Sequence, residues 1–202
     1  MPISIDTTKA EVARRALEAG ASIINDVSAL RVDPGIAMLA AESGTPLILM
    51  HMLGDPKSMQ VLPRYENLLE EILTFLEDAV EKAENQGVSR AKIIVDPGIG
   101  FGKTISHNLL LIKHLQTFTR LDLPILIGTS RKAFIRKILK DPQAQDIRPD
   151  LPIVENGTQA TVAAAILNGA HIVRVHDVSN TIATVKILDA LMNVKDSEGI
   201  GN

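Results

Sequence analysis

Six short apolar runs alternate with longer segments of helical spacing, and this alternation restricts the folds open to the chain. The runs lie at 3–6, 22–26, 46–51, 92–96, 124–128 and 171–175. The helical segments lie at 8–18, 34–43, 65–86, 108–118, 130–139, 157–167 and 181–192. Runs that are apolar at successive positions are typical of parallel strands covered by helices on both faces. We therefore expect a parallel α/β architecture of about six strand–helix units, with its longest loop at 140–155.

Polar residues lie at or next to the end of each run. They are Asp6, Asn25-Asp26, His51, Asp96, Thr129-Ser130, and Arg174 with His176-Asp177. Any one of them is most often a turn former or a helix cap. Six polar ends in six units instead favour a TIM barrel of the (β/α)8 type, where the carboxyl ends of the strands meet at the active site. Arg174 and His176 are two residues apart on one strand, so their side chains share a face and predict an anion site.

Composition limits the classes of partner. The 202 residues favour a single domain over 1–202, with 46% hydrophobic and 22% charged residues as in ordinary globular proteins. There is no cysteine, which excludes disulfides, thiolate metal sites and a cysteine nucleophile. A net charge of −3 and 2% aromatic residues argue against a nucleic-acid partner. No apolar run is long enough for a membrane span and no secretion signal is evident, so we expect a cytoplasmic protein.

The segment 96–104, DPGIGFGKT, resembles a phosphate-binding loop but has the wrong spacing. A Walker A motif needs four residues between its first glycine and the Gly-Lys-Thr, and that first position is Pro97 here. The glycine spacing of a dinucleotide-binding motif is also absent. We interpret the segment as a flexible loop, directly after a strand carboxylate, that suits a site closing over its ligand.

Six segments, in order along the chain, resemble the strand-end motifs of the dihydropteroate synthase family. They are IDTTKAEVA, IINDVSA, PLILMHMLGDPKSMQ, IIVDPGIGFGKT, LIGTSRKAFI and GTQATVAAAILNGAHIVRVHDV. The resemblance covers essentially the whole chain, and DPGIGFGKT, GTSRK and RVHDV are its specific parts. It implies a homodimeric transferase that joins 6-hydroxymethyl-7,8-dihydropterin pyrophosphate to p-aminobenzoate in folate biosynthesis, with Mg²⁺ assisting release of pyrophosphate. Sulfonamide drugs would compete for the p-aminobenzoate site.

The resemblance also implies a pterin site. Asp96 would hydrogen-bond the pterin ring together with Asn25 and Asp6, since a buried carboxylate accepts two N–H groups at once. Met50 would pack on the face of the pterin, and Gly128 would border the same site.

The remaining roles concern the leaving group and the second substrate. Arg174 and His176 would hold the pyrophosphate, where positive charge stabilises the leaving group. Lys132 would reach the pterin carbonyl and lie between the two substrates. Phe101, Lys132 and Ala133 would line the p-aminobenzoate site, whose carboxylate would lie at the start of the helix after GTSRK. The expected catalytic residues are Asp96, Lys132, Arg174 and His176.

Several positions have simpler interpretations. Asp6 could be the N-cap of the helix that follows it. Met50 could be an ordinary core residue, and His51 could be a buried core histidine or part of the site. Arg131 could make only loop or surface contacts.

Two features depart from the family pattern. Ala133 stands where the family usually has a serine, which removes one hydroxyl donor worth about 1 kcal/mol. The chain also begins at what resembles the family's third strand. We therefore expect an incomplete barrel, no metal ligand within this chain, exposed apolar edges, and a fragment that aggregates or self-associates. The sequence leaves open whether this chain is active alone.

Two other functions remain open at this point. A methyltransferase of the type that passes a methyl group from a folate to a corrinoid protein would share the pterin-binding Asp and Asn. It would have no evident use for Lys132 or for the pair Arg174 and His176. A non-catalytic pterin-binding remnant is the other alternative.

Overall fold

The computed structural model describes residues 1–54 and 63–194. The strands are β1 (Ser4–Asp6), β2 (Ile23–Asp26), β3 (Leu47–Met50), β4 (Ile93–Asp96), β5 (Leu126–Ile127) and β6 (Ile172–Val173). The α-helices are α1 (Ala10–Glu18), α2 (Gly35–Ser43), α3 (Leu68–Asn85), α4 (Ile105–Lys113), α5 (Ala133–Leu139), α6 (Pro152–Leu167) and α7 (Val178–Asn193). Two 3₁₀ helices, Arg90–Lys92 and Leu115–Leu121, complete the regular structure of these residues. None of the helices in these ranges is long and apolar enough to cross a membrane.

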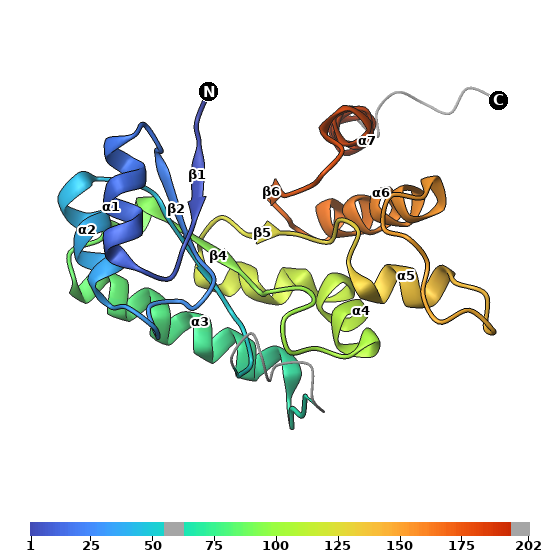
Figure 1. Cartoon of the computed structure of the whole chain (residues 1–202), viewed down its shortest axis with the longest axis horizontal. Helices are drawn as coiled ribbons and strands as arrows, with labels where there is room; N and C mark the ends of the chain where they lie inside the picture. The colour runs from blue at the N-terminus through green and yellow to red at the C-terminus, as the bar shows by residue number, and fades with distance from the viewer. Residues whose placement is uncertain (55–62, 195–202) are drawn as a thin grey trace.

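The strands form one parallel row in chain order. Strands β1 to β4 pair in sequence, and β5 pairs with β6. A single bridge between Val95 and Ile125 connects the two groups. Figure 1 shows the helices outside this row, with β1 and β6 at its two ends. No pairing between β1 and β6 occurs in the described residues, so the predicted parallel arrangement of about six strand–helix units is confirmed as an incomplete barrel.

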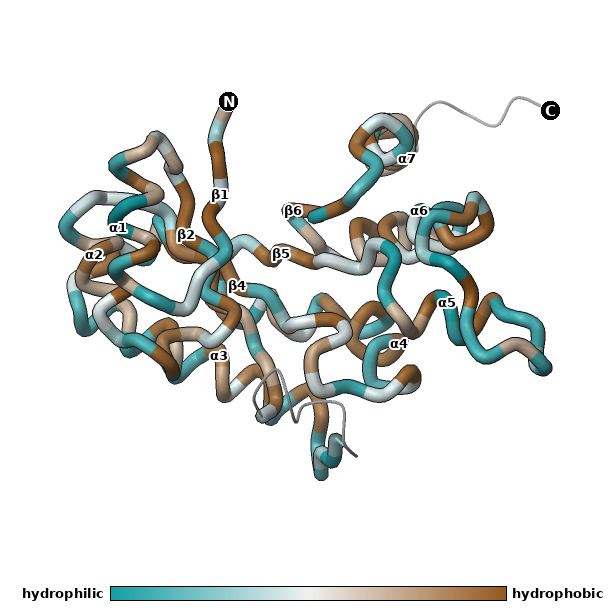
Figure 2. Tube along the Cα trace, in the orientation of Figure 1, coloured by the Kyte–Doolittle hydropathy of each residue, from teal (hydrophilic) through white to brown (hydrophobic). Residues whose placement is uncertain are grey.

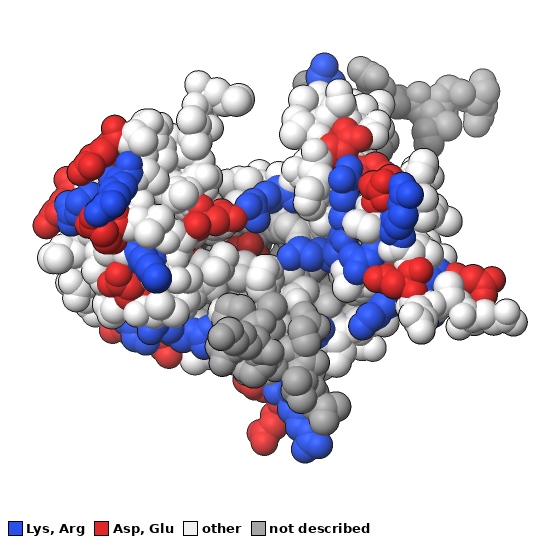
Figure 3. Space-filling view, in the orientation of Figure 1, with Lys and Arg blue, Asp and Glu red and all other residues white. Residues whose placement is uncertain are grey.

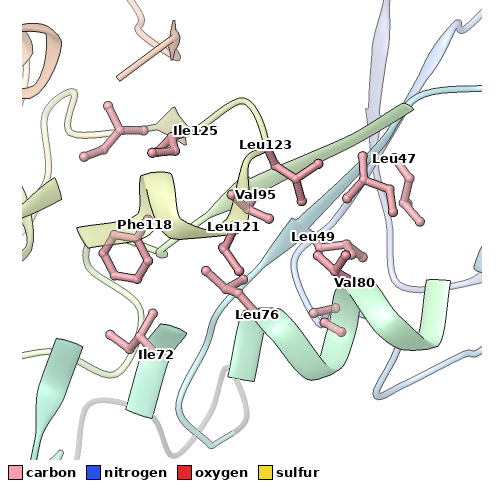
Figure 4. Packing of buried hydrophobic residues seen from close by; sticks show 14 of the residues in the cluster. Leu47, Leu49, Ile72, Leu76, Val80, Val95, Phe118, Leu121, Leu123 and Ile125 are labelled. Carbon is pink, nitrogen blue, oxygen red and sulfur yellow. The ribbon is translucent and has the colours of Figure 1, made fainter. Parts of the chain in front are cut away.

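Helix α3 covers the middle of the sheet. Its apolar residues recur every three or four positions. In Figure 4, Val80 lies beside Leu49 of β3, whereas Ile72 lies near Phe118 of the 3₁₀ helix. Asn67 accepts a hydrogen bond from the Glu70 N–H and so caps the helix. The buried face of α3 packs against the buried strands and holds them in place. This packing sets the positions of the strand ends.

Helix α7 leaves much of its apolar surface exposed. Ile182, Ile187 and Leu191 are 50%, 64% and 60% exposed. Figure 2 shows hydrophobic residues on α7 and β6 as well as in the interior. At the other end of the row, Ile3 beside β1 is 56% exposed. Both ends of the strand row thus carry apolar surface that this chain does not bury.

The helix predicted at 108–118 is two elements. Helix α4 begins earlier because Thr104 and His107 form a reciprocal capping box, in which each side chain accepts from the other's backbone N–H. It ends at Lys113, and a 3₁₀ helix, Leu115–Leu121, follows.

The long loop predicted at 140–155 is shorter than expected. Helix α6 begins at Pro152 rather than at 157. Proline suits this first helical position because its missing N–H has no helical partner there. The prediction was wrong because three prolines in the segment were all interpreted as loop residues.

Candidate active site

A cavity of about 340 Å³ lies at the carboxyl ends of the strands, and we call it the strand-end cavity. Every site residue that the sequence singled out lines it, except Ala133: Asp6, Asn25, Met50, Asp96, Phe101, Gly128, Lys132, Arg174 and His176. Figure 3 shows basic and acidic side chains meeting around a hollow near the centre of this face. Residues from both ends of the chain therefore meet in one site.

Asp6, Asn25 and Arg174 form one edge of the strand-end cavity. Asn25 Nδ2 donates to Asp6 Oδ1 over 2.8 Å, and Arg174 forms an ion pair with Asp6 Oδ2. Asn25 Oδ1 is buried and has no hydrogen-bond partner among the described residues. Such an acceptor favours a ligand that brings an N–H group. The N-cap of α1 is Lys9, so the interpretation of Asp6 as a helix cap is wrong.

Asp96 is the last residue of β4 and is buried. Its Oδ1 accepts a hydrogen bond of 2.7 Å from the Gly98 N–H. Burial raises the pKa of the carboxyl to about 6, although the Gly98 bond and the charges of Lys132, Lys103 and Arg174 oppose this. Asp96 is therefore a carboxylate whose charge changes just below neutral pH.

Lys132 lies between β5 and α5, directly before the first residue of the helix. Its ammonium lies 4.2 Å from the centre of the Phe101 ring, a cation–π contact. Burial lowers the pKa of Lys132, and nearby Asp96 partly reverses this. The preceding residue, Arg131, has a φ of 57° and donates its N–H to Thr158 Oγ1, which sets the direction in which Lys132 leaves the strand. Arg131 also pairs with Glu155 over 3.6 Å, and both Glu155 and Thr158 belong to α6, so the interpretation that Arg131 makes only loop or surface contacts is wrong.

The glycine-rich segment after β4 packs closely against other backbone. Gly98, Gly100 and Gly102 have φ values of 73°, 84° and 65°, which side chains rarely adopt. A Cβ on Gly98 would lie 1.8 Å from the carbonyl oxygen of His51. The Gly100 N–H donates to Asn108 Oδ1 over 2.7 Å. These contacts show that the glycines allow close packing of the segment, while its closing over a ligand stays a prediction.

His51 and Lys103 form a buried pair beside this segment. Lys103 Nζ lies 2.9 Å from His51 Nδ1 and donates to the Phe101 carbonyl oxygen over 3.0 Å. Burial, followed by the charges of Lys103 and Arg31, lowers the pKa of His51 to about 2, so His51 is neutral. Sequence reasoning left His51 undecided and missed Lys103. The available signal was a lysine directly after Gly-Phe-Gly, and it was set aside with the failed Walker A motif.

Ser130 holds His176 in place. Ser130 Oγ lies 2.8 Å from His176 Nδ1 and accepts the His176 N–H over 3.2 Å. The histidine therefore presents its other ring nitrogen, Nε2, to a ligand. Ser130 lines the same cavity and was not predicted as a site residue.

A second cavity, of about 710 Å³, adjoins the first, and we call it the adjoining cavity. Phe101 and Lys132 line both cavities, and Ala133 lines only this one. Its basic residues are Arg64, Lys103, Lys132 and Lys137. No acidic side chain lines it in the part of the chain that the structure describes. The charge of this cavity favours an anionic ligand.

The residues that line the two cavities include Asp6, Asp96 and His176, but they form no metal-binding cluster among the described residues. Within residues 1–54 and 63–194, no group of three or more His, Cys, Asp or Glu side chains could hold a metal ion. The described side chains alone therefore do not fit a magnesium site.

Comparison with known proteins agrees with this geometry. The model of a family described as pterin binding enzyme matches residues 1–176. A dihydropteroate synthase of a Synechocystis species is 46% identical over 191 residues, which are 95% of this chain and 64% of that protein. The chain thus spans slightly less than two thirds of the length of this relative.

Solved structures give the same relationship. A Yersinia pestis dihydropteroate synthase with a sulfonamide drug has a TM-score of 0.88 and 37% identity, covering 96% of this chain and 68% of that one. A Xanthomonas albilineans dihydropteroate synthase in complex with 7,8-dihydropteroate has a TM-score of 0.85 and 35% identity, covering 96% and 68%.

Proposed function

The chain belongs to the pterin binding enzyme family, and we propose that it carries out the dihydropteroate synthase reaction. In this reaction, 6-hydroxymethyl-7,8-dihydropterin pyrophosphate and p-aminobenzoate give 7,8-dihydropteroate and pyrophosphate. One observation carries the proposal: a cavity lined by both acidic and basic residues and a basic cavity share Phe101 and Lys132 as a common wall. One offers buried acceptors for a pterin, and the other offers cations for a benzoate.

The strand-end cavity suits the pterin. Asp96 would accept two N–H groups from the pterin edge, and Asn25 Oδ1 offers a third buried acceptor. Met50 is buried and would lie against the ring face. Gly128 adds no side chain to the cavity and leaves room for the ring.

The proposed reaction forms one covalent bond at the pterin methylene carbon and breaks another. The amine of p-aminobenzoate attacks the methylene carbon of the pterin, so a C–N bond forms while the C–O bond to pyrophosphate breaks. The electron pair leaves with pyrophosphate, and the amine gives up one proton, which the solvent takes up. Arg174 and His176 would stabilise the charge that develops on the leaving group. Lys132, in the shared wall, would position both substrates.

The adjoining cavity suits p-aminobenzoate and the sulfonamides that resemble it. Phe101 would pack against the aromatic ring, and Lys132 and Lys137 would attract the carboxylate. Ala133 would contribute only its backbone N–H. A corrinoid-dependent methyltransferase would have no use for this basic cavity.

Magnesium and a cytoplasmic location belong to the same proposal. Magnesium prefers phosphate oxygens and water, so substrate pyrophosphate would supply most of its ligands. Both substrates are soluble small molecules, which supports a cytoplasmic enzyme.

Replacing Lys132 tests the proposed reaction. We expect Lys132→Ala to lower kcat/KM at least tenfold, because a charge-assisted contact to both substrates is lost. The assay measures dihydropteroate formed from labelled p-aminobenzoate in the presence of Mg²⁺. Lys113→Ala, which changes an exposed lysine outside both cavities, is the matched control. Absence of product with the unmodified chain would contradict the proposed activity of this chain.

Pterin binding should depend on pH through Asp96. Below its pKa of about 6 the carboxyl carries a proton and cannot accept two N–H groups. We therefore expect affinity to rise between pH 5 and pH 7, by about tenfold per pH unit below the pKa. Titration calorimetry with a dihydropterin at constant ionic strength measures this. A constant affinity over that range would contradict a charged Asp96 as the pterin acceptor.

The exposed face of α7 supports the proposed homodimer. Ile187 and Leu191 would be covered by a second copy, because an apolar helix face of this kind is unfavourable in water. We expect light scattering to give twice the chain mass, and Ile187→Glu with Leu191→Glu to give the mass of one chain. Met38→Glu, at an exposed apolar position on α2, should leave the dimer intact. A monomeric unmodified chain would contradict the dimer.

A further inference from the structure

Lys103 is a buried lysine to which the proposed reaction assigns no specific role. The side chain is almost fully buried, with 6% of its surface exposed. Taking an ammonium group out of water costs several kcal/mol unless other groups compensate. Only one neutral ring nitrogen and one carbonyl oxygen lie within hydrogen-bond distance of its Nζ in the described chain. A residue placed at this cost, next to a site, is a candidate for a role in that site.

Lys103 joins two loops that build the cavities. His51, which accepts the Lys103 hydrogen bond, directly follows β3. Phe101, whose carbonyl oxygen accepts a second bond, lies in the glycine-rich segment after β4. The ring of Phe101 lies against the Lys132 ammonium and forms the wall shared by the cavities. Lys103 thus fixes the backbone of the residue that separates the two proposed substrates.

Lys103 also acts on the main pterin acceptor. The charges of Lys132, Lys103 and Arg174 each favour the ionised form of Asp96. In return, Asp96 favours the protonated form of Lys103, while Lys132 disfavours it. Burial has the largest effect and lowers the pKa of Lys103 to about 7. The titratable groups that face Lys103 are His51 after β3, Asp96 on β4, His107 on α4 and Lys132 before α5.

We propose that Lys103 is a positioning residue for the pterin site, which holds Phe101 against Lys132 and supplies a further positive charge beside Asp96. This inference rests on the proposed function and adds a residue to it. Its two parts differ chemically. Holding Phe101 needs a hydrogen-bond donor, whereas the effect on Asp96 needs a charge.

Three substitutions of Lys103 distinguish its hydrogen-bond role at Phe101 from its charge beside Asp96. Lys103→Gln keeps donors for His51 and the Phe101 carbonyl but removes the charge. Lys103→Arg keeps both donors and charge, and Lys103→Met removes both. Lys113→Met changes a lysine outside both cavities and is the control. Far-UV circular dichroism and thermal unfolding identify the variants that keep the fold.

Carboxyl ¹³C NMR of the unliganded chain is the first measurement, with Asp96→Asn used to assign the Asp96 signal. We expect Lys103→Met and Lys103→Gln to raise the pKa of Asp96, and Lys103→Arg to leave it near the parent value. Pterin affinity should then fall roughly tenfold near pH 6 in the first two variants, with the pH profile moved upwards. Only Lys103→Met should also weaken sulfonamide binding, since Phe101 loses its anchor.

The outcomes distinguish this inference from the proposed function. If the parent binds no pterin, the proposed function fails, but the NMR titration still measures the effect of Lys103 on Asp96. The same Asp96 titration in the parent and in Lys103→Gln would overturn the inference. Loss of the fold in all three variants would overturn it too, because Lys103 would then serve folding alone.

Discussion

Asp96→Asn should weaken pterin binding by on the order of 1,000-fold without destabilising the fold at pH 7. The asparagine Oδ1 can still accept the Gly98 N–H bond, which the carboxylate accepts at 2.7 Å. Its NH₂ group, however, faces the pterin N–H groups with a donor instead of an acceptor. Two charge-assisted hydrogen bonds are lost and a buried donor is left unsatisfied, together about 4 kcal/mol. Calorimetric titration with a dihydropterin measures the loss.

The stability of the same variant follows from the sign of the pKa shift. Asp96 has a pKa of about 6 in the fold and 3.8 as its reference value. Its contribution to stability is fully present below pH 3.8 and is lost as the pH rises through about 6. At pH 7 the buried charge therefore costs about 3 kcal/mol, which the asparagine avoids.

Urea denaturation at pH 5 and pH 7 checks this prediction. The difference in stability between the two pH values should be smaller for Asp96→Asn than for the parent. Asp78→Asn, at an exposed position on α3, is the control and should change stability by less than about 0.5 kcal/mol. Pterin binding within tenfold of the parent would exclude Asp96 as the main acceptor.

Gly98→Ala should destabilise the protein by roughly 4 kcal/mol and disorganise the site. The new Cβ would lie 1.8 Å from the His51 carbonyl oxygen, so backbone must move. The φ of 73° adds about 1 kcal/mol for a residue with a side chain. The His51 N–H donates to the Asp96 carbonyl oxygen over 2.9 Å, so this movement reaches the end of β4. Urea denaturation measures the loss.

Gly44→Ala provides the matched control. Gly44 has a φ of 64°, but a Cβ there would meet nothing within 4 Å. Gly44→Ala should therefore lower the free energy of unfolding only through its positive φ, by about 1 kcal/mol. The difference between the two variants isolates the close contact with His51. Equal losses of stability would show that this contact is relaxed at no cost.

The sequence predicted the strands better than the helix starts. Continuous apolar runs identify buried parallel strands because both faces of such strands exclude water. Helix starts depend on details such as the capping box of Thr104 and His107, where histidine replaces the usual Glu or Gln. Pro152 was missed because proline marks both loops and first helical positions.

The same contrast applies to the site. Asp96 and Arg174 could be predicted because the end of a parallel strand has a fixed place in such a fold. Lys103 was missed, because its importance comes from burial and from His51, a residue 52 positions away in the chain. No local pattern encodes that distance.

The ion pair between Asp6 and Arg174 has a consequence for the order of folding. Most strand pairings join neighbours in the chain, whereas this contact closes a loop of 168 residues. Closing so long a loop has a large entropic cost, and the exposed pair returns little energy for it. We therefore expect the two ends of the strand row to come together late, after the middle strands have packed around α3. A ligand that contacts both ends would hold them together. Pterin binding could therefore be measured to follow the last step of folding.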